Sequence, residues 1–579
     1  MKKTCILICT VLSQVLFAQS SNTMLSFEKS TGKKTATYHE VIGFYNELST
    51  FYPTVSFLEM GATDSGHPLH LAIFDPQGAR NSIASYSKNE RNLILILNGI
   101  HAGEPDGIDA TMLLYRDLAE NNFEIPKNTV IATIPVYNIG GFLNRNSTFR
   151  TNQNGPEEYG FRGNARNYDL NRDFIKADTK NAQSFIEIFQ LLNPDLFIDN
   201  HVSNGADYQY ILTHLFTQHN KLGGDLGRYL HTQFIPEFEK SLAQKGWDII
   251  PYVNVFNQKP ELGYAQFYDS PRYSTGYAAL FNTLGITVET HMLKPYKDRV
   301  EGTYQLMVSF INLADSDFQT IKTLRKNALP LYTIGSYYPI TWEIDSTKTT
   351  TLPFKGYEAD WIPSKVTQGN RLNFYRDQSF TKDINYWNHF KASDSIQIPK
   401  AYIVPKGYWN IEKLLKLNDI EFTTLEKDTV FTAEVYHIAN YETVKRPYEG
   451  HYLHYNTTLV KTIDSVSVKK GDFWIPTQQH GIRYILETLE PQARDSFFNW
   501  NFFDAILQQK EGFSPYVWED LAYEFLKANP RIKNEFDLKL KSDKEFAENT
   551  YRQLDWIHKK SPYYETSHMR YPIVRIMKQ

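Results

Sequence analysis

Short apolar runs bounded by turn residues alternate with helical patterns over the first 330 residues. The strand-like runs are Val55–Met60, His70–Phe74, Leu93–Leu97, Val130–Tyr137, Leu196–Asp199 and Ile286–Val288. Helical spacing follows a capping box at Thr37 and Glu40, and recurs over Asp106–Leu118 and Thr179–Leu192. This alternation predicts an α/β sheet rather than a helix bundle.

The pattern changes after about residue 329. One set of segments is strand-like, around a single short helix at Ile411–Leu417: Leu331–Ile344, Ala401–Val404, Val430–Ile438, Tyr452–Val468 and Asp472–Ile475. A second set is helical: Gly481–Leu489, Asp495–Leu507, Val517–Leu526 and Phe546–Ile557. We therefore expect an α/β domain over 30–325, a β-rich accessory domain over 330–480 and a C-terminal helical region over 481–579.

The N-terminus has the features of a signal peptide. Met1–Lys3 is positively charged, an apolar stretch runs from Ile6 to Phe17, and Ala18 is the expected cleavage point, so residues 1–18 are predicted to be removed on export. Both cysteines lie in this segment, so the mature chain would have no disulfide and no thiolate metal ligand. We expect a periplasmic or extracellular protein.

Composition removes several classes of function. The formal net charge of -4 gives no basic surplus that would favour nucleic acid or an anionic membrane. No later apolar run is long enough to span a bilayer. The 38 Tyr and 37 Phe residues suit aromatic cores or peptide and carbohydrate contacts, and abundant β-structure explains them more simply. Nothing in the sequence fixes an oligomeric state.

Metal chemistry is suggested by His101 and Glu104, which follow the buried strand Leu93–Leu97. Composition alone predicts about two His-x-x-acid pairs by chance, so the pair needs further ligands. His201 follows the strand Leu196–Asp199, and Glu289 ends another strand. Because ligands bind at the carboxyl ends of parallel strands, we expect these side chains to meet at one sheet edge.

A polar segment, residues 144–173, lies between these strands. It is too polar for a core and contains five arginines: Arg145, Arg150, Arg162, Arg166 and Arg172. A solvated loop is one interpretation. Guanidinium groups beside a metal edge also suit the recognition of carboxylates.

Together these residues make the chain resemble the zinc carboxypeptidases of the carboxypeptidase A superfamily (peptidase family M14), over roughly Thr37 to Leu313. The motif His-x-x-Glu followed far downstream by His is matched by His101, Glu104 and His201. The Asp-x-Asn-Arg segment is matched by Asp169–Arg172. The resemblance implies a mixed, mostly parallel sheet with helices on both faces and one Zn²⁺ ion.

The resemblance also implies roles for individual residues. His101, Glu104 and His201 would bind zinc, Glu289 would be the catalytic base, and Asn171 with Arg172 would hold the substrate's C-terminal carboxylate. Arg150 is the better match for the oxyanion-stabilising arginine, with Arg145 as second choice. The family's mobile tyrosine is matched best by Tyr273, with Tyr277 and Tyr264 open. The neighbouring Arg272 suggests a preference for an acidic side chain or a second carboxylate.

Three functions follow from these features. The leading one is an exported metallocarboxypeptidase acting on peptides with a free C-terminus. A second is an amidase or peptidase acting on the stem peptides of cell-wall peptidoglycan, because fold does not settle substrate. A third is an inactive peptide- or glycan-binding module, which the presence of Glu289 disfavours since a binding module has no need of a general base.

Overall fold

The computed structural model describes residues 24–78, 83–86 and 90–578. The predicted signal peptide, residues 1–18, lies outside the described residues. Within the described part, every helix is too short or too polar to cross a bilayer.

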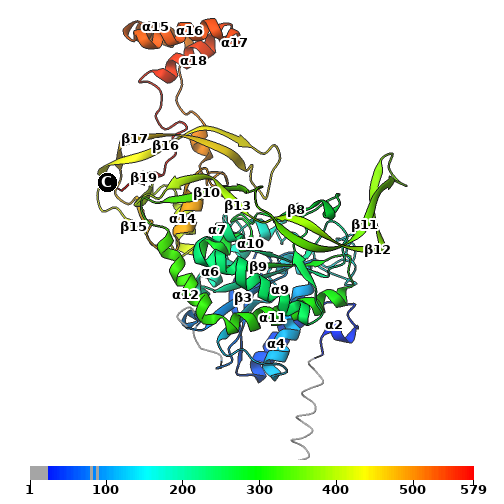
Figure 1. The fold of residues 1–579 in the computed structure, drawn as a ribbon. Coiled ribbons are helices and arrows are strands. Elements are labelled where there is room, and N and C mark those ends of the chain that lie inside the picture. Colours follow the sequence, from blue (N-terminus) through cyan, green and yellow to red (C-terminus); the bar gives the residue numbers. More distant parts are fainter. Residues whose placement is uncertain (1–23, 79–82, 87–89, 579) are drawn as a thin grey trace, which may run out of the picture.

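Eight strands form a mixed sheet at the centre of the first 330 residues, in the order β1-β2-β4-β3-β5-β9-β6-β7 (Figure 1). Their bounds are β1 Val55–Ala62, β2 Pro68–Phe74, β3 Asn92–Asn98, β4 Thr129–Ile134, β5 Leu196–Ser203, β6 Leu212–Phe216, β7 Ile249–Pro251 and β9 Leu284–His291. The central strands β4, β3, β5 and β9 are mutually parallel. On one side of this group β2 is antiparallel to both β1 and β4, and on the other side β6 is antiparallel to β9 and parallel to β7.

Helices cover both faces of this sheet. The longer ones are α3 Tyr38–Phe51, α4 Asp106–Glu120, α6 Lys180–Leu192, α9 Ile235–Gln244, α11 Tyr296–Ser316 and α12 Phe318–Ala328. Side chains of β3 alternate between two cores: Leu95 packs in the cluster that contains α6, and Ile94 packs in the one that contains α4 and α11. The predicted mixed, mostly parallel sheet with helices on both faces is confirmed.

Shorter elements connect these. They are α2 Ser26–Lys29, α5 Ile139–Leu143, α7 His219–Leu222, α8 Gly224–Tyr229, the π-helix η3 Leu230–Phe234, β8 Tyr264–Ala265, α10 Ser274–Ala278 and the 3-10 turn η5 Ala279–Phe281.

The chain beyond residue 330 is rich in strands, as predicted. β10 Tyr337–Ile344 pairs with β13 Phe390–Gln397, and the long hairpin of β11 Thr350–Pro363 and β12 Asn370–Trp387 extends from the body (Figure 1). A second sheet has the order β15-β18-β14-β19-β16-β17. Its strands are β14 Ala401–Val404, β15 Thr423–Thr424, β16 Thr429–Thr443, β17 His454–Val468, β18 Phe473–Pro476 and β19 Val574–Ile576.

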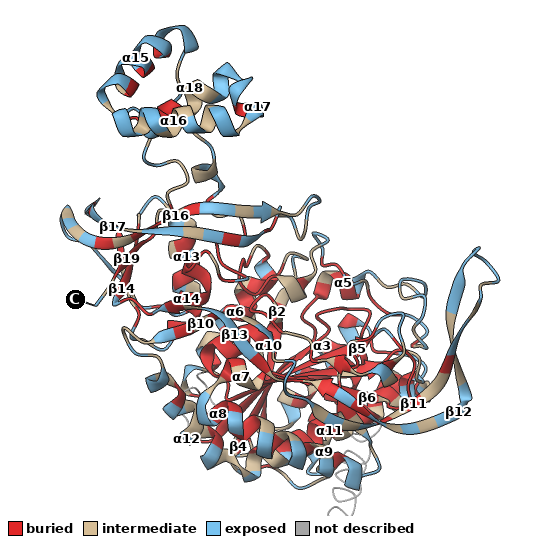
Figure 2. Cartoon of the chain, turned by 45° about the horizontal axis from the view of Figure 1, so that its top comes forward, coloured by how far each residue is buried: buried red, intermediate tan, exposed pale blue. Residues whose placement is uncertain are grey.

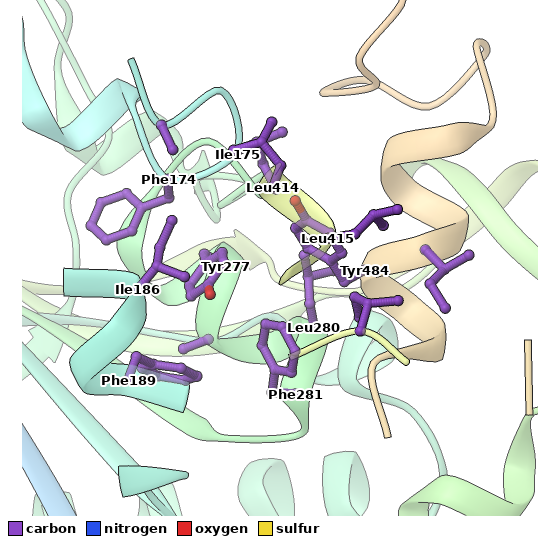
Figure 3. Packing of buried hydrophobic residues seen from close by; sticks show 14 of the residues in the cluster. Phe174, Ile175, Ile186, Phe189, Tyr277, Leu280, Phe281, Leu414, Leu415 and Tyr484 are labelled. Carbon is purple, nitrogen blue, oxygen red and sulfur yellow. The ribbon is translucent and has the colours of Figure 1, made fainter. Parts of the chain in front are cut away.

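One continuous apolar core joins these regions. Figure 3 shows Leu415 of α13 (Trp409–Leu417) and Tyr484 of α14 (Ile482–Leu489) near Phe281, with Phe189 of α6 on the far side of Phe281 in the same cluster. The predicted domain boundaries near residues 330 and 480 stay predictions. Apolar side chains of both later regions pack against the face of the sheet that α6 covers.

The last helices form a small unit that stands away from the body (Figure 1). They are α15 Pro515–Ala528, α16 Pro530–Ser542, α17 Lys544–Ala547 and α18 Thr550–Lys560. Trp518, Leu526 and Ile557 make a separate small core, and most other residues of these helices are exposed (Figure 2). The predicted helices over 517–526 and 546–557 are therefore confirmed, the second as two shorter helices, α17 and α18.

Two predicted elements are wrong. The expected helix over 495–507 is a series of turns that ends in a 3-10 turn at Asp504–Leu507, because Asn501 adopts a left-handed backbone with φ 66°. The strand expected from Leu331 begins only at Tyr337, since a 3-10 turn over Leu329–Leu331 contains Pro330.

Candidate active site

A cavity of about 600 Å³ opens at the carboxyl ends of the central parallel strands. His101 enters it from the loop after β3, His201 from β5 and Glu289 from β9. His201 and Glu289 are register partners on adjacent parallel strands, so their side chains leave the same face of the sheet. The cavity unites residues that are far apart in the sequence.

The predicted metal ligands converge. Nδ1 of His101 lies 3.2 Å from Nδ1 of His201, and the Glu104 carboxylate lies 3.3 Å from the first nitrogen and 3.2 Å from the second. All three side chains are buried. Two imidazole nitrogens and a carboxylate oxygen around one point are a donor set that suits zinc.

Two aspartates fix the opposite edges of these imidazoles. Nε2 of His101 lies 3.0 Å from Asp169 Oδ1, and Nε2 of His201 lies 2.8 Å from Asp199 Oδ2. Each carboxylate favours the tautomer with its proton on Nε2 and therefore leaves the Nδ1 lone pair for a metal. Neither aspartate was predicted from the sequence to orient a metal ligand.

Close packing holds the loop that carries His101 and Glu104. α4 begins directly after Pro105, whose missing N–H leaves no bond unmade at a helix start. A Cβ on Gly103 would lie 2.7 Å from Arg150 Cδ and 2.9 Å from the Gly160 carbonyl oxygen. Gly103 is thus required by close approach of the neighbouring loop.

Two arginines border Glu104. Arg150 donates to Glu104 Oε1 at 2.7 Å, and Arg162 Nη1 lies 3.8 Å from the same oxygen. Burial raises the pKa of Glu104, but Arg150 and the two histidines outweigh it and hold the pKa well below its ordinary value. Glu104 is therefore a carboxylate, the form that binds a cation. Arg162 lines the cavity, and the sequence analysis named it only as one of a cluster of arginines.

Glu289 has a different environment. Burial raises its pKa to about 8; His201 opposes this rise, while Glu104 and Asp199 add to it. Its side chain lines the cavity beside Thr287, which precedes it by two positions on the same face of β9. A carboxyl group with this pKa can accept and return a proton near neutral pH.

The predicted carboxylate-binding residues lie along one wall of the cavity. The Arg172 guanidinium sits 4.5 Å from the centre of the Tyr273 ring and donates to the Asn171 carbonyl at 2.7 Å. Asn171 Oδ1 accepts a hydrogen bond from the Ser274 N–H at 3.3 Å. Arg172, Asn171 and Tyr273 all line the cavity.

Other predicted residues lie elsewhere. Arg145 is outside the cavity lining and donates to the carbonyls of Ala36 and Glu158. Tyr277 and Tyr264 are buried away from it, with their hydroxyls bonded to Asn418 and to the Pro251 carbonyl. Of the three tyrosines considered, only Tyr273 reaches the site. Tyr252, unnoticed in the sequence, is also in the lining.

Arg272 does not face the cavity. Its Nε lies 2.6 Å from Asp495 Oδ1 and its backbone N–H donates to the other carboxylate oxygen at 3.0 Å, so its charge is already paired. The predicted preference for acidic side chains has no support from this residue. Instead, the pair fastens the Tyr273 segment to the C-terminal region.

The β-rich region supports the arginine-containing loop from outside. Glu449 accepts a hydrogen bond from the backbone N–H of Asp169 at 2.8 Å, and His451 Nε2 lies 2.7 Å from Asp178 Oδ2. Residues after 330 thereby help to set the position of Asp169 and, through it, of His101.

Comparison with known proteins finds similarity to carboxypeptidases. Residues 41–191 match the zinc carboxypeptidase family. Carboxypeptidase 2 of Trichophyton rubrum is 21% identical over 441 residues, covering 72% of this chain and 75% of that protein.

Matches among solved structures include a metallo-carboxypeptidase from Burkholderia cenocepacia, with 16% identity over 48% of this chain and 70% of that one and a TM-score of 0.36. Carboxypeptidase A from Helicoverpa armigera has 15% identity over 54% of this chain and 81% of that one, with a TM-score of 0.38.

Proposed function

We propose that this chain, whose residues 41–191 match the zinc carboxypeptidase family, removes C-terminal residues from peptides with a free chain end. The observation that carries the proposal is the convergence of His101, Glu104 and His201 beside Glu289 in one cavity. Metal-dependent hydrolysis of a peptide bond needs both a metal site and a base, and this cavity offers residues suited to both.

The residues present fit one zinc ion. The two Nδ1 atoms and the Glu104 carboxylate would hold it, since their ligand atoms lie within 4.8 Å of one another and the Nε2 atoms are already bonded to aspartates. When bound, zinc would act as a Lewis acid and lower the pKa of a water molecule to about 7. The carboxylates of Glu104 and Asp199, which lie against the imidazoles, add negative charge that favours a cation.

Glu289 is the base in this proposal. Its carboxylate takes a proton from the attacking water and returns it to the nitrogen of the leaving amine, so one group serves both steps. Its position across from His201 on the neighbouring strand keeps it at the reaction centre. Arg150 lines the cavity beside Glu104 and would face the oxygen that gains negative charge, where a fixed charge contributes on the order of 3 kcal/mol.

Arg172 and Asn171 orient the substrate. A guanidinium fork matches a carboxylate through two parallel hydrogen bonds, and the Tyr273 ring under Arg172 fixes the plane of the fork. An enzyme with this arrangement would cleave only the last peptide bond, because the chain end must lie against Arg172.

Product analysis by mass spectrometry tests the proposal. The enzyme is offered matched peptides with free and amidated C-termini and peptidoglycan stem peptides, with and without a chelator. Stepwise loss of C-terminal residues from the free peptides, abolished by the chelator, is the expected result. Cleavage confined to stem peptides would favour the cell-wall alternative, and binding without turnover would favour the inactive module.

We propose export as well, from the charge and apolar pattern of residues 1–18. N-terminal sequencing of the protein recovered outside the cytoplasm should begin at Gln19. An uncleaved cytoplasmic protein would contradict it.

A further inference from the structure

Three histidines outside the active-site cavity converge on one another. His219 belongs to α7, His231 to the π-helix η3, and His389 to the turn between β12 and β13. One ring nitrogen of each lies within 4.8 Å of those of the others. The ring centres of His219 and His231 are 4.0 Å apart, and His389 lies 5.0 Å from the first and 5.3 Å from the second.

The fold brings these segments together by its own hydrogen bonds. Gln218 Nε2 donates to the Asn388 carbonyl at 3.0 Å, and Asn220 Oδ1 accepts from the Phe390 N–H at 2.8 Å. These two bonds flank His389 on its turn and His219 on its helix. The π-helical turn, a feature often found at functional sites, gives His231 its place beside them.

The ring nitrogens of these three histidines are available to bind a ligand. Among the residues that the structure describes, their ring nitrogens form no hydrogen bond or ion pair with another side chain or with the backbone. All three are half-buried. Burial, together with the neighbouring imidazoles, lowers the pKa of His219 to about 3 and lowers that of His231. Burial also lowers the pKa of His389, with Lys348 adding to the fall and Asp345 opposing it.

We propose that His219, His231 and His389 form a second metal site that binds a divalent ion of the zinc, nickel or copper class. Neutral imidazole is the preferred nitrogen ligand of these metals, and three such ligands leave a further position for water. In a tetrahedral site with Zn–N of about 2.1 Å the nitrogens lie about 3.4 Å apart. The stacked rings of His219 and His231 turn out of their parallel arrangement to reach that geometry.

The space beside the histidines suits a hydrated ion. His219 and His231 border a cavity of about 140 Å³, whose wall also includes Glu239 and Asn388. None of the three histidines lines the active-site cavity, so the site is separate from the zinc site proposed above. The ion would cross-link α7 and η3 of the first domain to the β12–β13 turn of the β-rich region, and its role would be structural.

The proposal is tested by measuring the metal content of proteins that lack His201, one of the proposed active-site ligands. This measurement does not depend on peptidase activity. The proteins are the His201→Ala variant, the same variant with His389→Gln, and a control with His437→Ala, which removes a half-buried histidine of β16. After zinc loading and dialysis, mass spectrometry of the metal counts ions per chain. Adding His389→Gln should remove one equivalent, whereas the control should remove none.

Thermal melting gives a second readout. Zinc should raise the melting temperature of His201→Ala and of the His437→Ala control, and chelator should reverse the shift. The variant that also carries His389→Gln should melt at one temperature with or without zinc. Equal metal content and equal zinc shifts in all three proteins would overturn the proposal, and circular dichroism confirms that each protein is folded. His219→Ala in place of His389→Gln repeats the comparison if that variant does not fold.

Discussion

Asp199 Oδ2 lies 2.8 Å from Nε2 of His201, two positions along the same strand. The Ser274 hydroxyl also donates to this oxygen, so two groups hold the same carboxylate oxygen in place. Because side chains two apart on a strand share a face, β5 delivers a metal ligand together with the group that orients it.

Asp199→Asn should weaken zinc binding by about 10- to 100-fold, because the amide no longer holds His201 in the tautomer that frees Nδ1. Competition with a fluorescent chelator measures the affinity. Asp173→Asn is the matched control, since it removes a buried carboxylate that contacts Lys176 and no histidine. Equal zinc affinity in Asp199→Asn and wild type would remove Asp199 from the metal site.

Glu289→Gln should retain zinc and lose at least about 100-fold in kcat, because the amide cannot take a proton from water. Metal content and turnover of a C-terminally free peptide are measured on the same sample. Glu487→Gln provides the control: that glutamate is buried and bonded to Tyr338, outside the cavity. Undiminished turnover in Glu289→Gln would mean that another group is the base.

Much of the sheet could be predicted because its central strands are continuous apolar runs. Every residue of β3 is buried, and the three strand ends that carry His101, His201 and Glu289 were found from such runs. The hairpin of β11 and β12 could not, since most of its side chains are exposed or half-buried and show no apolar alternation.

The site was predictable in its parts and less so in its supporting contacts. Asp169 reaches His101 across 68 positions of sequence, and only the folded loop brings them together. Asp199 had a local signal, its place two residues before His201, which the sequence analysis did not use. Arg145 and Arg162 look alike in the sequence, but only Arg162 lines the cavity, because Arg145 donates to backbone carbonyls.

Asp495→Ala should destabilise the protein by about 3–5 kcal/mol, because it leaves the buried Arg272 guanidinium without its carboxylate. Urea unfolding measures the free energy. Asp537→Ala, which breaks the exposed pair with Lys533, should cost less than about 1 kcal/mol. Similar small losses in both variants would show that Arg272 finds another partner.

Asp109 should make stability depend on pH. Burial raises its pKa to about 6; hydrogen bonds from Tyr296, Thr35 and Ala36 oppose this rise and the Asp106 charge adds to it. Between about pH 4 and 6 the folded state therefore holds a proton that the unfolded chain has lost, so this residue's contribution to stability falls as pH rises. The asparagine of Asp109→Asn does not titrate, so the free energy of unfolding of this variant relative to wild type should rise from pH 4 to pH 7, by up to about 3 kcal/mol. Urea unfolding at both pH values measures this, and a constant difference would contradict it.

Arg172→Gln should raise KM for peptides with a free C-terminus and leave zinc content unchanged, because Arg172 would contact the substrate carboxylate and no metal ligand. The wild-type enzyme should cleave free peptides at least about tenfold better than amidated ones, and the variant should lose most of that difference, since a charge-assisted bond to a carboxylate contributes about 1.5–3 kcal/mol. Steady-state kinetics on matched free and amidated peptides measures both ratios.

Arg166→Gln is the matched control for Arg172. Arg166 belongs to the same loop and also lies over a tyrosine ring, that of Tyr168, at 4.9 Å, but it is outside the cavity lining and donates to the Asp178 carbonyl. It should keep the wild-type preference for free C-termini. If wild type cleaves amidated and free peptides equally, Arg172 does not bind the chain end, and the cavity belongs to an endopeptidase or an amidase.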